Sequence, residues 1–129
     1  MFRSNNQTMI IHSAAVVINP GSSLFIPVMI VKPNTTLCWS FTVKDYNCGF
    51  SVSTSKDSSS ESVIIPNETY GPNVEHKGSV VIGNATTVYL SWDNSYSWFR
   101  PKTVLYSISI EQPKNDIEDK HRSSLYYNR

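Results

Sequence analysis

The sequence is poor in several kinds of residue, and each shortage excludes a class of protein. Charged residues make up 16% of the chain and the formal net charge is +1, whereas charged residues usually reach ~25%. We therefore expect no overall field that attracts nucleic acid or an anionic membrane. No apolar run reaches the ~18 residues needed to span a bilayer. Five glycines are too few to suggest a phosphate-binding loop.

Reactive side chains are also not grouped in any pattern typical of catalysis or metal binding. No Gly-x-Ser-x-Gly turn occurs, which argues against that kind of nucleophile. The histidines are His12, His76 and His121, and none has a second ligand at metal-binding spacing. The acidic pair Glu118-Asp119 lies in a polar C-terminal segment where little would shift its pKa values. We expect no enzyme, no cofactor, no metal and no small-molecule substrate.

Only two cysteines are present, and their strand positions can be compared. Residues 35–43 and 48–54 alternate apolar and polar side chains around a four-residue turn, which predicts a hairpin with Val43 opposite Cys48. In that register Cys48 lies on the apolar face and Cys38 on the other. Opposite faces are a poor geometry for a disulfide, so we predict two free thiols, as in a reducing compartment.

Four Asn-x-Thr sequences favour the opposite compartment, because they match the glycan acceptor pattern of secreted proteins. They begin at Asn6, Asn34, Asn67 and Asn84. The apolar stretch from Met9 to Ile18 alternates, and it is more typical of a strand than of a signal-peptide core. A lumenal or secreted glycoprotein module is therefore kept as an alternative to a cytoplasmic one.

Alternating apolar residues, punctuated by turn residues, recur along the whole chain, a pattern typical of an antiparallel all-β sandwich or barrel. Proline inside one run, at Pro27, suggests an edge strand or a bulge. We predict a flexible segment over residues 1–9, a sandwich over 10–111 and a polar tail over 112–129. About eight strands are expected, at residues 10–18, 24–31, 35–43, 48–54, 62–65, 78–82, 86–92 and 103–110.

Two separated segments carry a family likeness. The first reads Leu37-Cys-Trp-Ser-Phe41 and continues as Tyr46-Asn-Cys-Gly-Phe50-Ser-Val52. The second reads Val88-Tyr-Leu-Ser-Trp-Asp-Asn-Ser-Tyr-Ser97, followed by Lys102 and Val104-Leu-Tyr106. Together they resemble the GOLD (Golgi dynamics) domain, with its Trp-x-Phe strand, Tyr-Asp-Ile-Gly-Phe-Gly-like strand and Trp/Phe-Asp-Asn-x-Tyr-Ser turn. The chain departs from that pattern at Asn47, Cys48 and Ser51.

The resemblance implies a jelly-roll-like β-sandwich that serves as a protein-interaction module in membrane traffic. Some relatives are lumenal parts of cargo receptors, and others are cytosolic domains attached to lipid-binding modules. The predicted free thiols favour the cytosolic branch. We therefore expect a cytoplasmic adaptor domain, associated with Golgi or endosomal membranes, whose partner is a protein of the trafficking machinery. Nucleic acid is not expected as a partner.

The segment Trp98-Phe99-Arg100-Pro101-Lys102 is the most suggestive candidate site. Exposed aromatics beside cations suit a protein hot spot or a lipid headgroup layer, so Trp98, Phe99, Arg100 and Lys102 are the predicted partner- or lipid-binding residues. The alternative is that one aromatic folds back and closes the end of the sandwich.

The preceding pair, Asp93-Asn94, could supply a base or a ligand. We favour a turn, because the alternation stops there and these side chains bond to nearby backbone. Four further aromatics fall on alternating strands and are expected in the core: Trp39, Phe41, Phe50 and Trp92.

Overall fold

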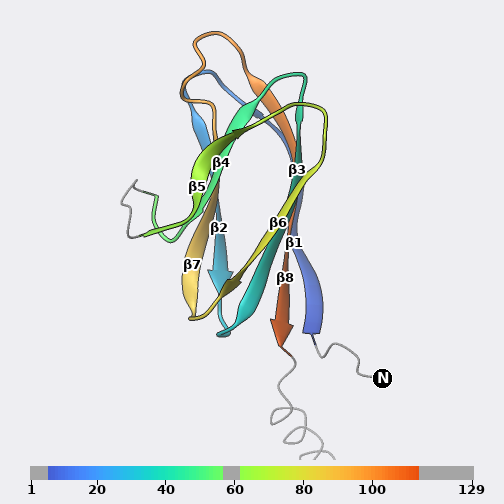
Figure 1. Cartoon of the computed structure of the whole chain (residues 1–129), viewed down its shortest axis with the longest axis vertical. Coiled ribbons are helices and arrows are strands. Elements are labelled where there is room, and N and C mark those ends of the chain that lie inside the picture. The colour runs from blue at the N-terminus through green and yellow to red at the C-terminus, as the bar shows by residue number, and fades with distance from the viewer. Residues whose placement is uncertain (1–5, 57–61, 114–129) are drawn as a thin grey trace, which may run out of the picture.

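The computed structural model describes residues 6–56 and 62–113 as two stacked sheets (Figure 1). Eight strands are formed: β1 (Asn6–Ile18), β2 (Ser23–Ile30), β3 (Thr35–Lys44), β4 (Cys48–Ser53), β5 (Val63–Tyr70), β6 (His76–Ile82), β7 (Thr86–Asp93) and β8 (Lys102–Pro113). One sheet has the order β1-β8-β3-β6 and the other β2-β7-β4-β5, and all pairs are antiparallel. The predicted all-β, jelly-roll-like sandwich is confirmed.

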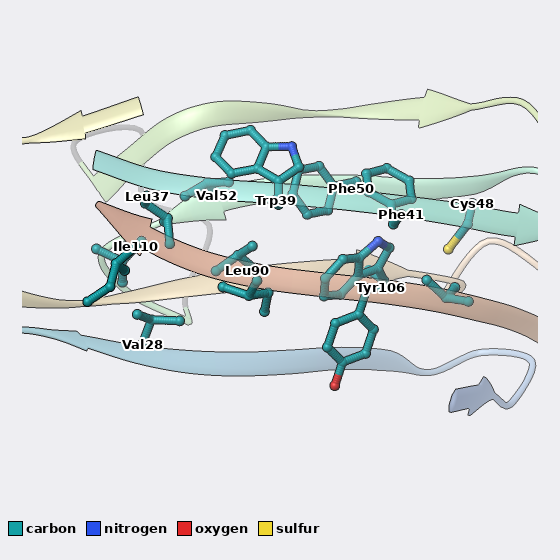
Figure 2. Close-up of a cluster of buried hydrophobic side chains, with 14 of the residues drawn as sticks. Val28, Leu37, Trp39, Phe41, Cys48, Phe50, Val52, Leu90, Tyr106 and Ile110 are labelled. Carbon is teal, nitrogen blue, oxygen red and sulfur yellow. The ribbon is translucent and has the colours of Figure 1, made fainter. Parts of the chain in front are cut away.

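The core lies between the two sheets, where alternate side chains from both meet (Figure 2). In β3, Leu37, Phe41 and Val43 are at most 2% exposed, because every second residue of a strand points to the same face. Rings from both sheets pack together: Phe41 lies 4.8 Å from Phe50 and 5.6 Å from Trp92 between ring centroids. The four aromatics expected in the core are all buried.

The predicted hairpin between residues 35–43 and 48–54 is wrong. β3 pairs with β8 and β6, whereas β4 lies in the other sheet beside β5 and β7. The chain therefore crosses between the sheets after Lys44, through Asp45 with its positive φ of 66°. Alternation still places each cysteine correctly: Cys48 is fully buried, Cys38 is half-buried on the outer face, and both are free thiols.

Three strand limits differ from those predicted by three residues or more, namely the start of β1 and the ends of β5 and β8. β1 begins at Asn6 because residues 6–9 pair with β8, whose last residues extend the sheet to Pro113. β5 continues through Pro66 to Tyr70. Proline is tolerated there because β5 is an edge strand whose pairing with β4 is irregular between Phe50 and Val52. The rest of the predicted flexible segment and tail, residues 1–5 and 114–129, lies outside the described residues.

Candidate functional site

The loop between β7 and β8 joins the two sheets at one end of the sandwich (Figure 1). Trp98 and Phe99 lie in this loop and are 85% and 86% exposed, and Arg100 beside them is also exposed. Neither aromatic closes the end of the sandwich, so the alternative in which one folds back is wrong. The loop thus presents two adjacent large aromatic side chains to the solvent.

Asn94 anchors the base of this loop. Its side chain is fully buried, and its Nδ2 donates to the carbonyl oxygens of Ile18 at 3.1 Å and Arg100 at 2.9 Å. A third carbonyl, that of Asn19, lies 3.3 Å from the same nitrogen. The backbone N–H of Asn94 donates to Ser22 O at 2.9 Å. One buried residue therefore ties the loop to the turn between β1 and β2.

Asp93 has a structural role, as the turn interpretation predicted. Its carboxylate accepts the backbone N–H of Ser95 at 2.8 Å, the hydroxyl of Ser23 at 3.0 Å and the amide of Asn67 at 3.1 Å. Burial by itself would raise the pKa of Asp93, but these hydrogen bonds outweigh burial and hold the pKa below its ordinary value. A carboxylate with its acceptor sites occupied in this way braces the turn.

The prediction that Lys102 belongs to the exposed binding surface is wrong. Lys102 opens β8 in phase with the core residues Val104 and Tyr106, so its side chain points inward and is only 2% exposed. Its ammonium donates to Asn47 O at 2.9 Å and to the Tyr96 hydroxyl at 3.3 Å. Burial lowers its pKa. Lys102 therefore holds Asn47 and Tyr96 from inside the sandwich. Of the two predicted cations, only Arg100 lies exposed beside Trp98 and Phe99.

Tyr46, Asn47 and Tyr96 also belong to this end of the sandwich, and the sequence interpretation did not include them in the site. The guanidinium of Arg100 lies 4.4 Å from the centroid of the Tyr46 ring, a favourable cation–π distance. The Tyr96 hydroxyl donates to Asn47. A signal was available, because the two segments of the family likeness meet here: Tyr46 and Asn47 come from the first and Tyr96 from the second.

The described residues contain no cluster of three or more His, Cys, Asp or Glu side chains able to hold a metal ion. In the same part of the chain, no helix has the length and apolar character needed to cross a membrane. This end of the sandwich presents two exposed aromatic rings and the exposed side chain of Arg100, on a backbone held by Asn94.

No protein-family model and no curated protein matches the chain, whereas 24 chains of solved structures do. The coat protein of Tobacco streak virus is 10% identical over 89% of this chain and 92% of that chain, with a TM-score of 0.49. A chain of the disulfide-linked pili known as Bacillus endospore appendages is 8% identical over 89% and 97%, also at 0.49. The CBM36-1 domain of a multidomain xylanase from the hindgut metagenome of Trinervitermes trinervoides is 6% identical over 82% and 96%, at 0.45. Likenesses this distant carry no conclusion about function.

Proposed function

We propose that this chain is a non-enzymatic interaction module of membrane traffic, as its resemblance to the GOLD domain implies, and that it makes contact through the β7–β8 loop. The observation that carries the proposal is the exposure of Trp98 and Phe99, 85% and 86%, on a loop anchored by buried Asn94. Exposed apolar surface of this kind is common at interaction sites. A cytoplasmic location at Golgi or endosomal membranes is part of the same proposal.

The shape of the loop favours a membrane surface as its partner. Protein hot spots are enclosed by a ring of surrounding contacts, whereas this loop forms the outermost part of one end of the sandwich (Figure 1). Trp is enriched at the membrane–water interface, and apolar groups bury ~5–10 Å deep there. Arg100 lies beside the aromatics, where its guanidinium can pair with lipid phosphate.

The expected contact is weak and reversible. Burying the Trp98 and Phe99 side chains would contribute roughly 3–6 kcal/mol before the costs of ordering and desolvation. The net charge of +1 and the burial of Lys102 leave little long-range attraction, so the contact should depend only modestly on salt. An adaptor with this loop alone would need a second membrane contact for stable attachment.

Co-sedimentation with vesicles of phosphatidylcholine and phosphatidylserine tests the proposal. We expect the wild-type chain to sediment with the vesicles and the Trp98→Ala/Phe99→Ala variant to remain in solution. The matched control is Met29→Ala/Val81→Ala, which removes apolar side chains that are 72% and 61% exposed on other strands and should sediment like wild type. Absence of wild-type sedimentation at low salt would refute the membrane contact.

A protein partner is the second candidate, favoured by the composition of the surface beside the loop. Tyr46 and Tyr96 are 41% and 47% exposed next to Arg100, and Tyr and Arg are enriched in protein interfaces. Capture of cytosolic proteins by the wild-type chain, the Trp98→Ala/Phe99→Ala variant and a Tyr46→Ala variant separates the two candidates. A captured protein lost with both variants supports a protein partner, and an unchanged set of captured proteins excludes this surface.

A further inference from the structure

We propose that strand β1 pairs with β1 of a second copy of this chain, which would join two sandwiches through one continuous sheet. Four strands lie at sheet edges: β1 and β6 in one sheet, β2 and β5 in the other. An edge strand exposes unpaired backbone N–H and C=O groups that can bind another strand. The four edges differ in how they are protected against such pairing.

Three of the edges carry residues that oppose strand addition. Pro27 interrupts β2, and Pro66 and Glu68 interrupt β5. In β6, Lys77 is exposed and lies 3.0 Å from the carboxylate of Glu75. Proline removes a backbone donor, and charged side chains at an edge disfavour contact with another strand.

β1 lacks these protections. It contains no proline, Asp, Glu, Lys or Arg, and in the part of the chain that the structure describes it pairs with β8 alone. Its one irregularity lies between Ile10 and His12. From His12 to Ile18 the register with β8 is unbroken, which gives a free edge of roughly 20 Å.

The absence of charge is what favours a second copy as the partner. In an antiparallel pair related by two-fold symmetry, the strand pairs with its own sequence. A charged side chain near the axis would therefore lie close to the same side chain of the second copy and repel it. β1 has none. With the axis at Ala15, Ser13 lies opposite Val17 and Ala14 opposite Val16.

The outer face around this axis is partly apolar, although Ser13 and Ser107 lie on the same face and share a hydrogen bond of 2.9 Å. Val17 is 59% exposed, and Ala15 pairs with Leu105 of β8, which is 47% exposed. In the dimer these side chains and their symmetry mates would form one apolar stripe across the new strand pair. The stripe would be partly removed from water, which favours association.

The mass in solution, measured by sedimentation equilibrium over a range of concentrations, tests the pairing. We expect wild type to reach twice the chain mass of 14.6 kDa. Ala15 is exposed, so Ala15→Lys is compatible with the folded monomer but sets two ammonium groups side by side at the axis. Like charges directly opposite are destabilising, and we expect the dimer dissociation constant to rise roughly tenfold or more.

Two further samples make the test specific. Val81→Lys places the same charge on β6, the other edge of this sheet, where the wild-type side chain is 61% exposed, and it should leave the dimer intact. An equimolar mixture of Ala15→Lys and Ala15→Glu should restore association, a result that unfolding cannot produce. A wild-type chain that stays monomeric at all concentrations, or an Ala15→Lys variant that dimerises like wild type, overturns the proposal. These sedimentation samples contain no membrane, so the measured mass is independent of the proposed membrane contact.

Discussion

Replacing Asn94 by alanine should destabilise the protein by about 2–3 kcal/mol. The wild-type amide donates to Ile18 O at 3.1 Å and Arg100 O at 2.9 Å. Each such hydrogen bond contributes roughly 0.5–1.5 kcal/mol, and a buried acceptor left without its donor costs roughly 1–3 kcal/mol. Part of this loss is offset, because the variant also removes the buried Oδ1 of Asn94, which finds no donor among the described residues. A buried polar atom without a partner is unfavourable in the wild type.

Urea denaturation, followed by tryptophan fluorescence, measures this change. The midpoint should fall with an unchanged slope, because the variant exposes the same surface on unfolding. Ser97→Ala is the matched control: its hydroxyl lies in the same loop and exchanges hydrogen bonds with the backbone of Arg100 at 3.1 and 3.2 Å in an exposed position. We expect this control to change stability by only about 0.5 kcal/mol.

An Asn94→Ala variant that loses less than about 1 kcal/mol would refute the reasoning, because the buried carbonyl of Ile18 would lose this donor and Arg100 O would keep only the Ser97 hydroxyl. Asn94→Asp is a second check. Its carboxylate would face the same carbonyl oxygens in place of a donor, so burial and repulsion would raise its pKa. The folded state would then bind a proton that the unfolded chain releases, and the variant should become less stable as pH rises from 4 to 7.

Two further predictions concern the core. Burial raises the pKa of the Cys48 thiol from 9.0 to about 11, so the folded state keeps a proton that the unfolded chain releases. Stability should therefore fall by up to about 2 kcal/mol as pH rises from 9 to 11. Denaturation of Cys48→Ala should show a smaller fall over that range, and an identical fall would contradict the assignment. Gly78→Ala would place a Cβ 2.5 Å from Cζ2 of buried Trp39, whereas the Cβ of Gly83→Ala meets nothing within 4 Å. Thermal unfolding should show a loss of stability of about 1–3 kcal/mol for Gly78→Ala alone. Equal melting temperatures for the two variants would contradict this prediction.

The hydrophobic pattern predicted which side chains face the core, but it could not predict which strands are neighbours. Cys48 and Cys38 were assigned to the correct faces although the hairpin that carried them was wrong. Alternation depends only on the direction of a side chain relative to its own strand. Pairing between β3 and β8 joins residues far apart in the sequence, such as Trp39 and Ile108, and local periodicity contains no information about that distance.

Lys102 shows why part of the site was missed. Its spacing from Val104 and Tyr106 is that of an inward side chain, but the predicted strand began one residue later and the charge favoured the surface, because lysine is rarely fully buried. At the end of the sandwich the long side chain can lie inside while the ammonium reaches Asn47 O and Tyr96. Exposure of Trp98 and Phe99 could not be decided from sequence, because whether a loop folds back depends on its anchors, above all Asn94.

The position of β8 has a consequence for synthesis on the ribosome. The last strand of the described chain is an inner one, with β1 on one side and β3 on the other. During translation, β1 and β3 emerge early but remain without their shared neighbour until residues 102–113 are made. Assembly of this sheet must therefore wait for nearly the whole domain, a non-local order of events that slows folding. Nascent chains stalled before Lys102 should be sensitive to protease and dependent on chaperones.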